Sequence, residues 1–424
     1  MHSYPTVPTL SALALAISLV SGQALANEDV FGSAEPSDDL FGGAALVSGT
    51  VSTDLNLAED MLTGADALNW SGDFQWETAS IMIDQQNVSH DRQVTSQLSG
   101  NLKLDARPDV DYRVLVNLDY SADQDGTSGS LREAFADFDL DNKIFVRAGQ
   151  QTLQWGVGYF FSPADTLSQD KIAANDPDQD RVGTLAAKVH KPVDTANYYS
   201  YLIPDDQANN HTVALKGEWL LNGQEWGLGA IKHANDEVNL VVTGSIPTKI
   251  GDFFTEYSAS LGETSVGINA DNTTFDRSDE LLHQFTMGVR ASQDFGTSSS
   301  ISLTGQYYYN GLGYTEATWS NLPVTWKTLT QDSELPDQLS QQLAAVMIRL
   351  DEPFGRPLAL SVLALSSLTD DSTMVDSSLT LTPNDYMSTA LTVTSMFGDA
   401  GSEYAGQGEL NRYKVSLTLG GQSF

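Results

Sequence analysis

KIFVRAGQQT, residues 143–152, alternates between two kinds of side chain along its length. Ile144, Val146 and Ala148 fall on one face of an extended strand, and Arg147 falls on the opposite face. A strand of about ten residues with one apolar and one mixed polar face is the repeating unit of a transmembrane β-barrel, because lipid covers one face and water the other. This segment therefore predicts a strand whose Arg147 faces a watery interior.

A tight turn precedes this strand and a long polar connection follows it. Asp141-Asn142 is typical of a short turn. Residues 154–183, QWGVGYFFSPADTLSQDKIAANDPDQDRVG, exceed what a hairpin requires, and alternation resumes at Leu185. Long connections with aromatic and charged content are usually functional, so this long loop is the first candidate for a functional element.

The same alternation recurs through the rest of the chain from Leu68 onward. Counting the expected hairpins gives about 16 to 18 antiparallel strands, an even number that brings both chain ends to one side of a membrane. The fold class predicted is all-β, a transmembrane antiparallel β-barrel. The clearest runs are residues 70–78, 98–106, 112–120, 213–221, 283–291, 301–309, 358–364 and 413–419.

The expected connections are short and long in turn. This pattern predicts short periplasmic turns and long extracellular loops, whereas a soluble β-sandwich or β-helix predicts no such alternation. The short connections are residues 141–142, 221–224, 352–356 and 382–385. The long ones are residues 81–93, 123–130, 154–183, 263–280, 310–340 and 398–408.

The N-terminal part divides into two segments before the barrel, which is expected over residues 68–424. Residues 1–26 contain a short apolar core ending in Ala24-Leu25-Ala26, which predicts a secretory signal peptide. Residues 27–67 are acidic at their start and predict a periplasmic tether or plug-like segment. The tether repeats EDVFG as DDLFG, and two copies of a docking peptide for a periplasmic partner are the alternative interpretation.

Composition limits the classes of function. Lys and Arg total 21 against 56 Asp and Glu, a net charge of −35, which excludes a nucleic-acid partner and favours cations over anions. Cysteine is absent, and the six histidines show no metal-ligand spacing, so no metal or cofactor is predicted. Residues 175–180 contain alternating oxygen ligands but lack the glycine and closing glutamate of a calcium loop. No nucleophile motif accompanies the histidines, so an enzyme is not expected.

Two stretches resemble known outer-membrane proteins. The block RAGQQTLQWG (147–156), continuing into FFSPAD (160–165), resembles a segment of porin-like outer-membrane families. The resemblance implies a porin or exporter barrel in the outer membrane of a Gram-negative-type bacterium, in contact with its lipid. Phe424 follows the last alternating strand and resembles the C-terminal signal read by the barrel-assembly machinery, although it is out of phase with the apolar positions.

By hairpin count the long loop is the third extracellular one, which constricts classical porins. If it folds into the lumen, its carboxylates face Arg147 and create a transverse field that selects solutes by charge and size. The alternative for Trp155 and the neighbouring aromatics is a plain membrane-interface anchor. The residues expected to line the constriction are Arg147, Gln151, Gln154, Trp155, Asp165, Asp170 and Arg181.

The function predicted is a channel for passive passage of small hydrophilic solutes or ions, with a preference for cations, because a barrel of this size leaves an aqueous lumen. The alternative is a non-conducting structural or adhesive protein that binds partners through its extracellular loops. The sequence leaves open whether the barrels associate as homo-trimers.

Overall fold

In a computed structural model of the chain, the described residues are 68–85, 91–109, 111–168, 173–204, 211–233, 238–261, 267–268, 274–275, 277, 279–296, 298–315, 338–399, 402–405 and 410–420. The predicted signal peptide, the tether and Phe424 lie outside these residues, as does Asp170.

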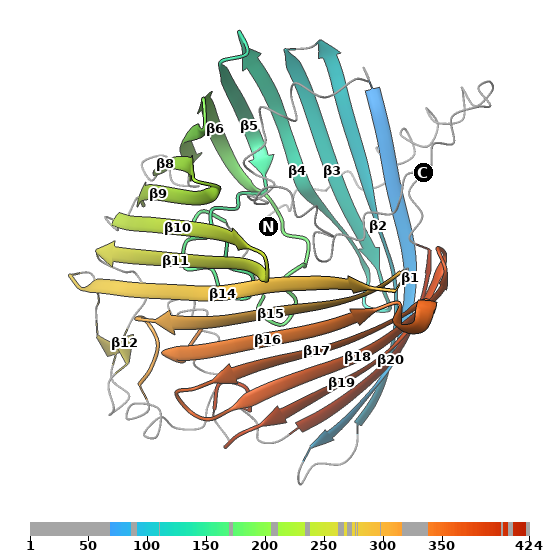
Figure 1. Cartoon of the computed structure of the whole chain (residues 1–424). Helices are drawn as coiled ribbons and strands as arrows, with labels where there is room; N and C mark the ends of the chain where they lie inside the picture. The colour runs from blue at the N-terminus through green and yellow to red at the C-terminus, as the bar shows by residue number, and fades with distance from the viewer. Residues whose placement is uncertain are drawn as a thin grey trace, which may run out of the picture. The chain divides into compact units, whose positions relative to one another are not determined.

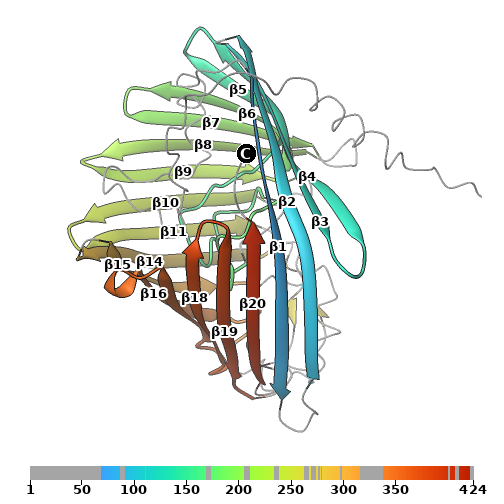
Figure 2. The same ribbon diagram turned by 90° about the vertical axis from the view of Figure 1, so that its right-hand side faces the viewer.

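Eighteen strands form one closed antiparallel sheet, as predicted (Figure 1). Closure comes from β1, which pairs with β2 on one side and with β20 on the other (Figure 2). The strands are β1 (Leu68–Gln85), β2 (Asp91–Asp109), β3 (Tyr112–Ala122), β4 (Thr127–Leu140), β5 (Ile144–Gln151), β6 (Thr184–Val193), β7 (Ala196–Pro204), β8 (His211–Leu221), β9 (Gln224–Lys232), β10 (Val238–Thr248), β11 (Gly251–Leu261), β14 (Leu281–Phe295), β15 (Ser299–Asn310), β16 (Gln342–Asp351), β17 (Leu358–Ser367), β18 (Thr373–Asn384), β19 (Met387–Phe397) and β20 (Leu410–Gly420).

Two minor elements complete the described structure. The two-residue strands β12 (Gly267–Ile268) and β13 (Thr274–Phe275) pair only with each other. A short 3₁₀ turn, η2 (Pro353–Gly355), lies between β16 and β17. Within the described part of the chain, no helix has the length and apolar character needed to cross a bilayer.

Side-chain alternation gives the barrel an apolar outer belt. Leu215, Leu228 and Leu240 face outward on three neighbouring strands and are 58%, 53% and 53% exposed. Their inward neighbours Lys216 and Val241 are buried. Because a soluble protein rarely exposes so continuous an apolar surface, this belt is the face that lipid covers.

The connections sort into two ends of the barrel. At one, called the turn end, hairpins such as Asn222-Gly223 are tight, with both residues at positive φ (56° and 77°). At the other, called the loop end, the connections include the long loop and residues 311–341. The predicted alternation of short and long connections is confirmed.

Two of the expected long connections are shorter than predicted. Ile83 pairs with Asp91, so most of residues 81–93 lies in β1 and β2. Thr127 pairs with Ala122, so the second connection is residues 123–126. Residues 81–83 (IMI) are apolar on both faces, and residues 91–93 (DRQ) and 127–130 (TSGS) are polar on both faces. Neither pattern alternates, so a search for hydrophobic alternation misses these strand ends, whereas the ladder depends only on backbone hydrogen bonds.

Adjacent residues at the middle of β19 test the assignment of faces. Leu391 faces outward and Thr392 faces inward. We expect Leu391→Arg to lower the free energy of unfolding in lipid vesicles by about 2–4 kcal/mol, because the cation would lie in hydrocarbon. Thr392→Arg should cost less than about 1 kcal/mol, because its side chain meets water. Equal losses in a urea titration would contradict the assignment.

Candidate functional site: the loop inside the barrel

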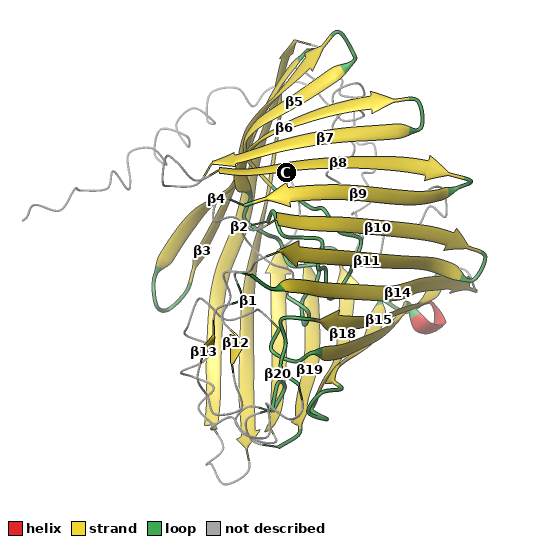
Figure 3. Ribbon diagram, turned by 90° about the vertical axis from the view of Figure 1, so that its left-hand side faces the viewer, coloured by secondary structure: helices red, strands yellow, loops and turns green. Residues whose placement is uncertain are grey.

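The long loop leaves β5 and runs through the barrel interior before it joins β6. Figure 3 shows connecting segments in green inside the curved sheet, and residues of this loop contact strands far away in sequence. Several of its large side chains are almost fully buried, including Trp155 (0% exposed) and Phe160 (1% exposed). The backbone N–H of Gly183 returns to the Arg132 carbonyl on β4 at 2.9 Å. The loop is thus a lumenal element and not a surface excursion.

The first half of the loop packs against β6 to β10. Leu153, Trp155, Ala164 and Leu167 form one apolar cluster with inward side chains of these strands, namely Ala186, Tyr199, Tyr201, Ala214, Ile231 and Val241. The Lys216 Nζ donates a 2.8 Å hydrogen bond to the Trp155 carbonyl and also pairs with Glu218 at 2.7 Å. Trp155 is therefore part of the packed interior, which differs from its alternative role as an interface anchor.

The Glu256 carboxylate on β11 accepts hydrogen bonds from four donor groups of the loop. It accepts hydrogen bonds from the backbone N–H groups of Val157, Gly158 (2.5 Å) and Ala164 (3.0 Å). The Ser162 hydroxyl donates to both of its oxygens, at 3.1 and 3.0 Å. The Glu256 side chain has no exposed surface. A buried carboxylate is stable only when its lone pairs are satisfied, and here the loop satisfies them.

Gln306 on β15 holds the next turn of the loop. Its Oε1 accepts the N–H groups of Tyr159 (3.2 Å) and Phe160 (2.8 Å). Its Nε2 donates to the Phe161 carbonyl and to the Thr286 hydroxyl. Phe161 stacks on Tyr308 with ring centroids 5.3 Å apart, and an apolar cluster extends from there to β16, β17 and β18. The loop consequently bridges two facing arcs of the wall.

Asp165, Asp178 and Arg181 of the loop make polar contacts with other side chains of the loop. Arg181 Nη1 lies 2.6 Å from Asp165, whose other oxygen accepts a 2.7 Å hydrogen bond from Ser168. The Tyr159 hydroxyl donates to Asp178 at 2.7 Å, and the Arg290 guanidinium lies 4.6 Å from the Tyr159 ring centroid. Burial, followed by the hydrogen bond to Asp178, raises the pKa of Tyr159, so this phenol stays protonated and acts as a donor.

Arg147 faces the lumen and pairs with a carboxylate of the barrel wall. Its Nε and Nη2 donate to Asp137 on β4 at 2.7 and 3.0 Å, and Arg113 lies 3.6 Å from the same Asp137. The transverse field expected between Arg147 and the loop carboxylates stays a prediction. The contacts with Asp137 form a series of alternating charge along the wall. The reason is register, since Asp137 and Arg147 are directly opposite in neighbouring strands.

The other predicted residues take different positions. Gln151 is fully buried and donates to the Ala186 carbonyl at 3.0 Å, so it joins β5 to β6. Gln154 is half-buried at the start of the loop, and Asp165 is close to Arg181 as described.

Three residues that hold the loop were not predicted from the sequence, namely Glu256, Gln306 and Lys216. In the sequence, each of them is visible only as a polar residue at an inward position of an alternating strand.

At the loop end, a second contact joins three connections. Glu403, between β19 and β20, accepts the N–H groups of Leu339 (3.3 Å) and Ser340 (2.8 Å). The Glu403 N–H donates in turn to Asp370, between β17 and β18, at 2.8 Å. Burial, with a further contribution from the negative charge of Asp370, raises the pKa of Glu403 to about 7.

Comparison with known proteins identifies the fold and no more. No protein-family model matches the chain, and a search of curated proteins found no match. OprD of Pseudomonas aeruginosa superposes with a TM-score of 0.50 at 8% identity, covering 86% of this chain and 98% of that one. OpdK from the same species and a BenF-like porin from Pseudomonas fluorescens Pf-5 each give 0.50 at 10% identity, covering 84% of this chain and 99% of theirs. The chain has the fold of these outer-membrane barrels.

The anchoring of the loop by Glu256 leads to a direct test. Glu256→Ala leaves four donors without their acceptor, and each unsatisfied donor costs about 1–3 kcal/mol. We expect hydrogen exchange of the Val157, Gly158 and Ala164 amides to accelerate by about a hundredfold or more. Ser258→Ala, two residues along the same inward face, is the matched control and should leave their exchange unchanged. Undiminished protection in Glu256→Ala would contradict the anchoring role.

The Glu403 contact should depend on pH. Because the folded pKa lies above the ordinary value for glutamate, the stabilisation is complete below about pH 4.5 and is lost as pH rises through 7. We expect the Ser340 amide to be better protected from exchange, after correction for intrinsic rates, at pH 5.5 than at pH 8. Glu403→Gln should abolish that difference, and a difference retained in this variant would rule out Glu403 as its source.

Proposed function

We propose that the protein is an outer-membrane channel for passive passage of small hydrophilic solutes, and that the long loop narrows its lumen. The observation that carries the proposal is the uneven filling of the barrel. The loop packs on β6 to β11 and on β14 to β18, whereas inward polar side chains on β1, β2 and β20 stay exposed, among them Asp73, Gln75, Gln97 and Arg412. A polar and solvated arc of wall is what a water-filled path requires.

The proposed orientation follows from the two ends of the barrel. In barrels of bacterial outer membranes, the short turns face the periplasm and the longer loops face outward. The turn end is accordingly assigned to the periplasm, which also fits the predicted signal peptide and tether. The fold shared with OprD and OpdK supports the outer membrane as the location.

In this proposal, the loop limits the size of the solutes that pass and contributes less to selection by their charge. The Asp165 and Arg181 side chains neutralise each other, and Trp155, Phe160 and Phe161 are packed against the wall. Preference for cations is proposed to arise on the exposed arc, where Asp73 is one contributor, in agreement with the acidic composition. Arg147 supports the wall through Asp137 and lies among the residues that line the interior.

A plugged, adhesive barrel is the second candidate. The same loop contacts favour it, because a segment fixed at Glu256 and Gln306 crosses the interior and occupies much of it. Loops at the loop end, such as residues 311–341, would then bind the partner. The two candidates differ in one property, which is conduction.

Single-channel recording in a planar bilayer under a salt gradient separates these candidates. We expect discrete open steps with a reversal potential on the cation-selective side. The double variant Glu256→Ala/Gln306→Ala should conduct more and with larger current noise, because the loop loses both anchors. Ser258→Ala should behave as the parent protein. A folded barrel that never opens in either form would replace the channel by the plugged alternative.

A further inference from the structure

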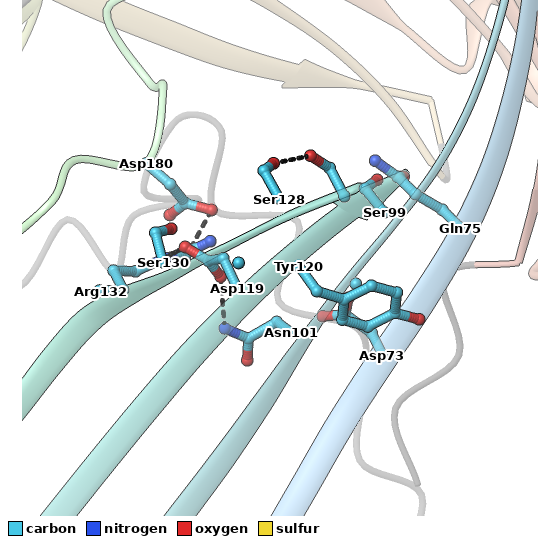
Figure 4. Close-up of a pocket in the computed structure, with 13 residues that line it drawn as sticks. Asp73, Gln75, Ser99, Asn101, Asp119, Tyr120, Ser128, Ser130, Arg132 and Asp180 are labelled. Atoms are coloured by element: carbon cyan, nitrogen blue, oxygen red, sulfur yellow. Dashed lines mark hydrogen bonds and ion pairs between the residues drawn. The ribbon is translucent and has the colours of Figure 1, made fainter. Parts of the chain in front are cut away.

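A polar cavity lies on the inner side of β1 to β4, next to the end of the long loop (Figure 4). Its volume is about 520 Å³, within the roughly 300–1,000 Å³ of small-molecule sites. It is lined by Asp73, Gln75, Ser99, Gly100, Asn101, Asp119, Tyr120, Ser121, Ser128, Gly129, Ser130, Arg132 and Asp180.

The lining has an unusual chemistry for a binding cavity. Ligand sites are commonly built mainly from apolar and aromatic side chains with a few polar groups. Here the only lining residues without a hydrogen-bonding side chain are Gly100 and Gly129, and no aliphatic side chain contributes. An apolar solute would gain little from entering, whereas a solute rich in hydroxyl groups finds donors and acceptors throughout.

A β-bulge positions Arg132, the single cationic side chain among the residues that line this cavity. The register between β3 and β4 shifts after Asn117, which pairs with Glu133, while Leu118 pairs with Leu131. Arg132 is the extra residue, and a bulge re-aims the side chain it carries. Figure 4 shows Arg132 directed toward Asp119 and Asp180.

Those two carboxylates neutralise the guanidinium. Arg132 lies 2.6 Å from Asp119 on β3 and 2.7 Å from Asp180 of the loop, and Asn101 donates to Asp119 at 2.9 Å. Asp73 on β1 is exposed and makes no ion pair or hydrogen bond with another described residue. One side of the cavity thus holds the hydrogen-bonded network around Arg132, and the other side presents the carboxylate of Asp73 as an acceptor. Carboxylates outnumber cationic groups in the lining.

We propose that this cavity binds a sugar of one or two rings that carries no negative charge. Asp73 accepts hydroxyl or ammonium hydrogens, and the serine and amide groups pair with the remaining hydroxyls. An amino sugar should bind most tightly and a neutral sugar next, whereas a uronate is repelled by the excess carboxylates. The inference deepens the proposed function, because the cavity borders the exposed arc assigned to the solute path.

Saturation-transfer NMR on the refolded barrel in detergent micelles tests this order, with glucosamine, glucose and glucuronate as probes. We expect saturation transfer to glucosamine and glucose and none to glucuronate. Asp73→Asn should weaken glucosamine binding about tenfold, the loss of one charge-assisted hydrogen bond. Asp376→Asn removes a carboxylate from the inner face of β18 and serves as the matched control, with binding unchanged.

Ser99→Phe provides a second variant that fills the cavity and should abolish binding of both sugars, with heat-modifiable migration as the check on folding. Glucuronate binding equal to glucose, or sugar binding unaffected by both Asp73→Asn and Ser99→Phe, would overturn the proposal. The readout requires no conduction, so a closed barrel that still binds sugar would refute the channel alone. An open barrel that binds none would refute only the sugar site.

Discussion

The carboxylate of Glu256 is the contact on which the interior arrangement depends. A loop that leaves a β-ladder and enters a barrel carries backbone N–H groups that need new partners. Glu256 supplies acceptors for three of them and for Ser162, and Gln306 supplies an acceptor for two more. These two side chains stand on inward positions of β11 and β15, so they decide which arc of the wall the loop covers and which arc stays open to water.

Lipid imposes a second constraint on the whole barrel. A strand whose outer face meets hydrocarbon must direct its polar side chains inward, where carboxylates and the cationic groups of arginine and lysine neutralise one another across strands. The series Arg113, Asp137 and Arg147 shows this on β3 to β5, and Glu77 with Lys414 shows it where β1 meets β20. The interior of the protein is therefore organised by charge pairing and loop packing together.

Much of the fold follows from the sequence, because a period of two with one apolar face indicates an amphipathic strand, and the alternation of short and long connections favours a barrel over a soluble sheet. The strand expected at residues 143–152 is β5, and the eighteen strands of the sheet fall within the expected 16 to 18. The pairing of Arg147 with Asp137 could not be predicted from the sequence, because local alternation does not show which residue lies opposite in the next strand. Glu256 and Gln306 lie roughly 100 and 150 residues from the loop segments they hold, and no local pattern encodes such contacts. The bulge at Arg132 also shifts register in a way that alternation cannot show.

The central claim is that an aqueous path remains beside the folded loop. Osmotic swelling of liposomes that contain the refolded protein tests it most directly, with uncharged polyols of increasing size as solutes. We expect rapid swelling with the smallest polyols and a sharp decline as the solute becomes larger, because the loop narrows the lumen without sealing it. Liposomes that do not swell in any of these solutes, although the protein in them is folded and inserted, would contradict the account.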